Sequence, residues 1–100
     1  MKKILHIVNQ SPFAHQALNQ CLERYRAADS ILLIGDGVYG ALNNNAQAEH
    51  LSRIEHCYAL QDDISARGIE KNQLLQNIEL IDDNKFVKLS ITHPLSQSWF

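Results

Sequence analysis

The two cysteines, Cys21 and Cys57, are the side chains best suited to nucleophilic chemistry in this sequence. A thiolate can accept and pass on sulfur, and its reactivity depends on surroundings that lower the thiol pKa. Cys21 shares the apolar stripe of a predicted helix with Leu18 and Tyr25, a position typical of a buried, unreactive thiol. Two interpretations of Cys21 therefore stay open, a core residue and a persulfide site, whereas Cys57 is predicted to be core.

The five histidines form no recognisable metal-binding pattern. They lack H-x-x-x-H and H-E-x-x-H spacing and do not combine with the cysteines into a zinc motif, so we expect no metal site. His6 lies inside a predicted strand and is expected to be an internal, hydrogen-bonded histidine. His15 and His50 are expected to be solvated.

The segment from Gly35 to Gly40 matches G-x-G-x-x-G and directly follows a predicted strand. Asp36 would place a carboxylate inside a loop that should cradle phosphates, which costs electrostatic energy. We therefore predict a tight turn that needs glycine, and expect no bound cofactor. Nucleotide binding remains the alternative interpretation.

Four short apolar runs predict buried strands, and polar helical patterns separate them. Continuous apolar character is typical of strands covered on both faces of a parallel sheet. The sequence therefore predicts an α/β fold, a three-layer α/β/α sandwich with a small, mainly parallel sheet of four to five strands. The runs are Ile4 to Val8, Ile31 to Ile34, Cys57 to Leu60 and Ile78 to Ile81.

Capping residues predict where the helices lie. Ser11 and Pro12 favour a first helix that starts there and runs to Tyr25. A second helix is expected within 38–53, broken by the asparagine run at 43–45. Carboxylates favour helix starts, so a third helix is predicted from Asp62 and Asp63 to Gly68, and a fourth from Asp82 to His93-Pro94.

Composition predicts a single domain over residues 1–100. The chain is 45% apolar with a net charge of -2, so no basic excess favours direct binding of nucleic acid or of an anionic membrane. No apolar run approaches the ~20 residues that cross a bilayer. The start shows no secretory pattern, and we expect a cytoplasmic protein with reduced thiols.

The tail at 94–100 ends in two aromatic side chains, Trp99 and Phe100. No sheet is predicted for it to join. Large aromatic surfaces are costly to leave in water, so we expect these residues either to bind a partner subunit or to fold back on the domain.

Four segments in this order carry a resemblance that runs from end to end. With them the sequence resembles the TusB/DsrH family of small sulfur-relay subunits, within the DsrE/DsrF/DsrH-like superfamily. The segments are LHIVNQSPF at 5–13, ILLIGDGVYGAL at 31–42, YALQDDISARGI at 58–69 and FVKLSITHPLSQSW at 86–99.

This resemblance implies a single DsrEFH-like α/β/α domain that joins TusC-like and TusD-like sister subunits in a dimer of heterotrimers. It implies a mainly structural role in a relay from a TusA-like donor to a TusE-like acceptor, toward 2-thiolation of the wobble uridine of tRNA. The alternatives are a DsrH-type role in sulfur oxidation and direct carriage of persulfide by Cys21, because some DsrH-type members carry a cysteine at that position.

Overall fold

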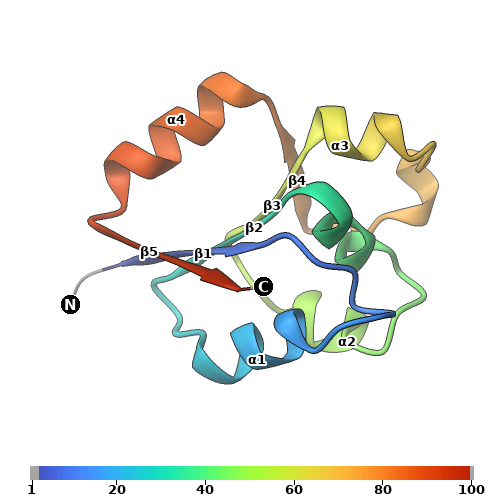
Figure 1. Ribbon diagram of the computed structural model, residues 1–100, viewed down its shortest axis with the longest axis horizontal. Helices are drawn as coiled ribbons and strands as arrows, with labels where there is room; N and C mark the ends of the chain where they lie inside the picture. Colours follow the sequence, from blue (N-terminus) through green and yellow to red (C-terminus); the bar gives the residue numbers. More distant parts are fainter. Residues whose placement is uncertain (1–2, 100) are drawn as a thin grey trace.

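Five parallel strands form one sheet in the computed structural model, which describes residues 3–99 (Figure 1). The order across the sheet is β4-β3-β2-β1-β5, so β5 and β4 are the two edges. The prediction of a mainly parallel sheet with four to five strands is confirmed. The strands are β1 (Ile4–Val8), β2 (Ser30–Leu33), β3 (Cys57–Leu60), β4 (Ile78–Ile81) and β5 (Leu95–Trp99).

Helices cover both faces of the sheet and complete the predicted sandwich. Figure 1 shows α1 and α2 on one side and α4 on the other. The helices are α1 (Ala17–Arg24), α2 (Ala48–Leu51), α3 (Gln61–Ala66) and α4 (Asp83–Thr92), with 3₁₀ turns at Gly35–Ala41 and Lys71–Gln73.

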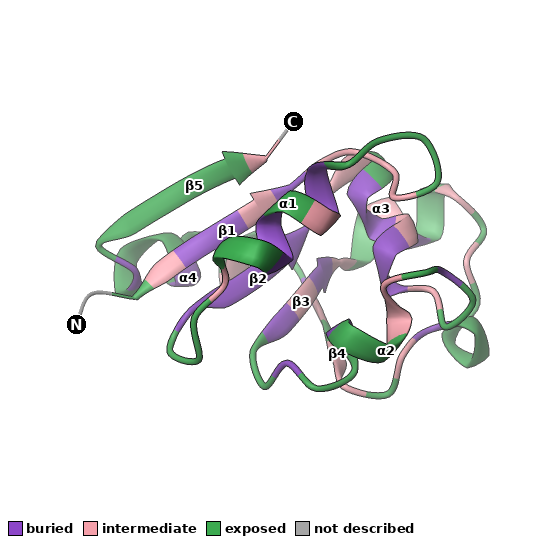
Figure 2. Cartoon of the chain, turned by 90° about the horizontal axis from the view of Figure 1, so that it is seen from below, coloured by how far each residue is buried: buried purple, intermediate pink, exposed green. Residues whose placement is uncertain are grey.

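The central strands are the most buried part of the molecule (Figure 2). All four residues of β2 are buried, which accounts for the unbroken apolar run that predicted this strand. The larger core cluster packs α1 against the sheet through Leu18, Cys21 and Leu22. A smaller cluster under α4 joins Leu89 to Leu5 and Leu32.

The first helix starts later than predicted. Ser11 does not cap it, because α1 begins at Ala17 and residues 11–14 form a separate turn. In that turn the Ser11 hydroxyl accepts a hydrogen bond from the Phe13 N–H at 3.2 Å, and the Ser11 carbonyl accepts from Ala14 at 3.2 Å. Local side-chain bonding of this kind competes with helix formation.

The other helix predictions fit the structure closely. Asp82 caps α4, since its Oδ1 accepts a hydrogen bond from the Lys85 N–H at 2.9 Å. Gly68 follows α3 with a φ of 65°, a conformation that favours glycine. The asparagine run does interrupt the second helical segment, and the buried Asn45 donates to the carbonyls of Gly40 and Leu42.

The prediction that the tail joins no sheet is wrong. Residues 95–99 form β5, which pairs in parallel with β1 in a register that runs from Ile4 opposite Leu95 to Val8 opposite Trp99. The strand was missed because it is an edge strand with mostly exposed, polar side chains, and therefore lacks the apolar run that marked the others. Phe100 lies outside the described residues.

Candidate functional site

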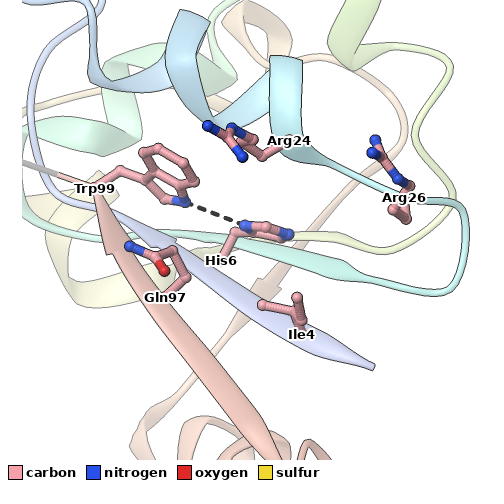
Figure 3. Close-up of a pocket in the computed structure, with 6 residues that line it drawn as sticks. All are labelled: Ile4, His6, Arg24, Arg26, Gln97 and Trp99. Carbon is pink, nitrogen blue, oxygen red and sulfur yellow. Dashed lines mark hydrogen bonds between the residues drawn. The ribbon is translucent and has the colours of Figure 1, made fainter. Parts of the chain in front are cut away.

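A cleft of about 530 Å³ opens beside α1, over β1 and β5 (Figure 3). Two residues from β1, two from β5 and two arginines at the end of α1 and just after it line the cleft. Sheet pairing aligns the strand residues, because His6 lies opposite Gln97 in the register of β1 and β5. The lining residues are Ile4, His6, Arg24, Arg26, Gln97 and Trp99.

A chain of hydrogen bonds runs beneath this cleft from Trp99 through His6 to Asp29. The Trp99 Nε1–H donates to His6 Nδ1 at 3.1 Å, and the two rings stack with their centroids 6.1 Å apart. An indole nitrogen only donates, so Nδ1 must accept, and His6 Nε2–H is left to donate to Asp29 Oδ2 at 2.8 Å. The contacts thus define one tautomer of a neutral His6.

Asp29 is buried but well supplied with donors. Its Oδ1 accepts from the Ile4 N–H at 3.0 Å, and its Oδ2 accepts from the Arg26 N–H at 3.1 Å as well as from His6. Desolvation by itself would raise the pKa of Asp29, but the hydrogen bonds from His6, Ile4 and Arg26 together hold this pKa below its usual value. The carboxylate therefore ties the turn after α1 to the start of β1.

The structure places Trp99 at this site and half-buries its ring against the domain. We expected Trp99 either to bind a partner subunit or to fold back on the domain, and its contacts with His6 show that it folds back. The remaining exposed part of Trp99 lines the cleft, so contact with a partner subunit stays a prediction. The prediction for Phe100 falls outside the described residues.

Cys21 lies on α1, near the same cluster, but inside the core. It is fully buried. Burial raises the pKa of the Cys21 thiol to about 12, and the charge on Asp29 raises it further. A thiol with so high a pKa is almost entirely protonated at neutral pH, which makes it a poor nucleophile. Its surroundings therefore fit the core interpretation, and a persulfide role would require the helix to open.

Cys57 is buried as well, as predicted. Burial raises the pKa of its thiol to about 12, and the nearby Cys21 adds to the increase because two thiolates would repel each other. Both thiols belong to the core cluster between α1 and the sheet. In this conformation neither cysteine is accessible to a sulfur donor.

The glycine segment at 35–40 forms a 3₁₀ turn whose polar groups bind one another. The Gly35 N–H donates to Asp63 Oδ2 at 2.8 Å, and Asp36 Oδ1 pairs with Arg67 Nη2 at 2.8 Å. Gly37 lies so close to β1 that an added Cβ would stand 2.1 Å from the Val8 carbonyl oxygen. The segment thus has the geometry of the predicted tight turn. The Gly35 amide and the Arg67 guanidinium, which a phosphate would need as partners, are already bound to carboxylates of the chain.

Residues 3–99 contain neither a candidate metal cluster nor a helix that could cross a membrane. Within this range no three His, Cys, Asp or Glu side chains gather closely enough to hold a metal ion. No helix in the same range combines the length and apolar character required to span a bilayer.

Most of the cleft was not predictable from the sequence, although one of its residues was. The sequence predicted an internal, hydrogen-bonded His6, and the 1% exposure of this residue and its two partners confirm that prediction. It did not single out Asp29, Arg24, Arg26 or Gln97. Asp29 sits in a turn between helix and strand, where an acidic residue is unremarkable, and its contact with His6 joins residues 23 positions apart.

A parallel five-stranded sheet between helices, with its cleft at the β1–β5 edge, places the chain among α/β/α sandwich domains. Two solved structures share this fold. The ychN protein from E. coli is 14% identical with a TM-score of 0.81, covering 99% of this chain and 100% of that one. Protein Tm0979 from Thermotoga maritima is 26% identical with a TM-score of 0.65, covering 88% and 91%.

Sequence comparisons identify the family within this class. The family described as DsrH like protein matches residues 10–96. Protein TusB of Enterobacter sp. (strain 638) is 36% identical over 97 residues, and Protein TusB of Escherichia coli (strain K12) is 34% identical; each match covers 96% of this chain and 100% of the relative. The chain therefore belongs to the DsrH-like family, and the predicted TusB/DsrH resemblance is confirmed.

Proposed function

We propose that this chain is an assembly subunit of a cytoplasmic sulfur-relay complex that supplies sulfur for 2-thiolation of the wobble uridine of tRNA. One observation carries the proposal, namely the full-length similarity to proteins called TusB within the DsrH-like family. In this proposal the chain binds TusC-like and TusD-like sister subunits in a dimer of heterotrimers. A TusA-like protein delivers the sulfur, and a TusE-like protein receives it.

The burial of both thiols supports an assembly role over a sulfur-carrying one. Persulfide transfer needs a thiolate that can reach the sulfur atom it attacks. Cys21 and Cys57 are buried, and their thiol pKa values are raised to about 12. The reactive thiol of the relay would then lie on a sister subunit, and this chain would hold that subunit in place.

Two measurements test the proposal. Native mass spectrometry of the complex purified gently from its own cells should show this chain with small TusC-like and TusD-like subunits in equal amounts. Deletion of the gene should remove 2-thiouridine from the tRNAs for Lys, Glu and Gln. A deletion strain with normal thiolation would refute the tRNA role.

A DsrH-type role in sulfur oxidation is the alternative within the same family. It is supported by the match to the DsrH-like family as a whole. Genes for sulfite reductase beside this gene, together with sulfur-oxidising growth, would favour that alternative. Their absence together with loss of thiolated tRNA on deletion would exclude it.

A further inference from the structure

The outer edge of β5 is open and unprotected. Among residues 3–99, β5 pairs with β1 and with no other strand, so alternate N–H and C=O groups along Leu95–Trp99 point away from the sheet. Exposed edges are normally blocked by charged side chains or by proline within the strand. The strand LSQSW contains neither, because Pro94 precedes it. An edge of this kind is suited to pairing with another strand.

The sheet face next to this edge is also uncovered. Gln97 and Trp99 line the cleft on the side of the sheet where α1 lies, and α1 ends at Arg24 without covering them (Figure 3). Leu95 belongs to the same face, because alternate residues of a strand share a face. Leu95 is 47% exposed. The side chains of a strand added to β5 could therefore pack against both apolar and polar side chains of β5.

Two arginines, Arg24 and Arg26, stand over the cleft, and neither forms an ion pair with a carboxylate of residues 3–99. The nearby carboxylate of Asp29 is buried and engaged by three donors, and the Arg26 side chain reaches only the Tyr25 carbonyl, at 3.3 Å. A guanidinium group can bind a carboxylate through two parallel hydrogen bonds. The rim of the cleft formed by Arg24 and Arg26 is therefore complementary to acidic side chains.

We propose that β5 and the cleft beside it form a docking site for an extended, acidic segment of a sister subunit. The segment would pair with the β5 edge as a sixth strand, and its carboxylates would reach Arg24 and Arg26. This inference rests on the proposed function, because it places one partner of the complex at a particular surface of this chain.

A second copy of this chain fits the surface less well. Pairing two copies through β5 would bring together two identical strands, and the residues of Leu95–Trp99 include no acid. Such a dimer would leave Arg24 and Arg26 without carboxylates from the added strand. The two arginines therefore favour a different strand that carries acidic side chains over a second copy of β5.

The test uses the co-expressed complex with its TusC-like and TusD-like subunits. The variant Arg24→Glu/Arg26→Glu reverses the charge of the rim, and the control Lys71→Glu/Lys88→Glu makes the same change in charge at exposed positions away from the cleft. Arg24→Gln/Arg26→Gln removes the charge without reversing it. Melting of each isolated chain verifies that it is folded.

We expect charge reversal to weaken assembly about a hundredfold, the neutral variant to weaken it less, and the control to leave it unchanged. Hydrogen exchange should slow in β5 when the wild-type complex forms. Equal assembly by all variants, equal weakening by the control, or unchanged exchange in β5 would overturn the inference. Failure of the wild-type chain to bind either subunit would instead refute the proposed function.

Discussion

The indole N–H of Trp99 donates to Nδ1 of His6, joining the last described strand to the first across 93 positions of sequence. Because His6 in turn donates to Asp29, the three side chains form one buried chain of hydrogen bonds. This relationship links the edge strand to the turn after α1, and it makes a stability test of the cleft possible.

Replacing Trp99 by Phe should lower the free energy of unfolding by about 1–2 kcal/mol. The substitution keeps an aromatic ring but leaves the buried His6 Nδ1 without its donor. Urea denaturation measures the change. Phe13→Ala, at an exposed position, is the control and should shift the free energy by less than about 0.5 kcal/mol. Equal stability of wild type and Trp99→Phe would show that the hydrogen bond contributes nothing.

Asp29 should make the protein acid-sensitive. Because the pKa of this carboxyl is lower in the folded chain than its ordinary value of 3.8, the stabilisation is present above that value and is lost as pH falls through the lower folded-state pKa. Denaturation at a series of pH values should show this loss below about pH 4.

The variant Asp29→Asn isolates this effect. It should be less stable than wild type at neutral pH by about 2–3 kcal/mol, since the three donors to Asp29 lose their charged acceptor, and the new amide group cannot accept from all of them. The difference between the two proteins should shrink in acid. A difference that stays constant with pH would assign the acid sensitivity to other carboxylates.

Cys21 should react slowly with iodoacetamide in the native protein and rapidly in urea. Burial and the raised thiol pKa both suppress the thiolate that this reagent attacks. Mass spectrometry of digested samples separates Cys21 from Cys57. Rapid native labelling of Cys21 alone would favour the direct persulfide carrier over the assembly subunit.

Gly37→Ala should destabilise the fold by about 3 kcal/mol or more. The new methyl group would meet the backbone of Val8, which cannot move without disturbing β1. Gly68→Ala is a useful comparison, since nothing lies near its Cβ position and only the φ of 65° opposes it. It should cost about 1 kcal/mol. Similar losses in the two variants would argue against the close contact with Val8.

Millimolar NAD or ATP should leave the melting temperature unchanged. The Gly35 N–H is bound to Asp63, and Asp36 places a carboxylate in the segment where a phosphate would lie. Thermal denaturation with and without each nucleotide measures this. A rise in melting temperature that grows with nucleotide concentration would revive the dinucleotide interpretation.

The three central strands β1, β2 and β3 were predictable because burial on both faces favours apolar runs, and the runs at 4–8, 31–34 and 57–60 match them to within a residue. β4 is an edge strand with an exposed Glu79, and it was predictable because three of its four residues are still branched apolar ones. The start of α4 at Asp82 and the end of α3 near Gly68 were also predictable, because each depends on residues close together in the sequence.

The missed features depend on contacts between distant residues. β5 is polar because only part of one face is covered, so its pairing with β1 leaves little trace in its own composition. The cleft needs Arg24, Arg26 and Gln97 to meet, and they come from separate elements. The start of α1 was misplaced for a different reason, since Ser11 and Pro12 suit a turn as well as a helix start.

The parallel pairing of β1 with β5 also has a consequence for synthesis on the ribosome. β5 is made long after β1, so one side of β1 stays open until residues 95–99 have emerged from the ribosome. A chain that stops short of residue 95 would expose β1 as an edge and leave His6 without Trp99. Synthesis of β5 therefore completes the pairing of β1, and products that stop before it should be prone to aggregate.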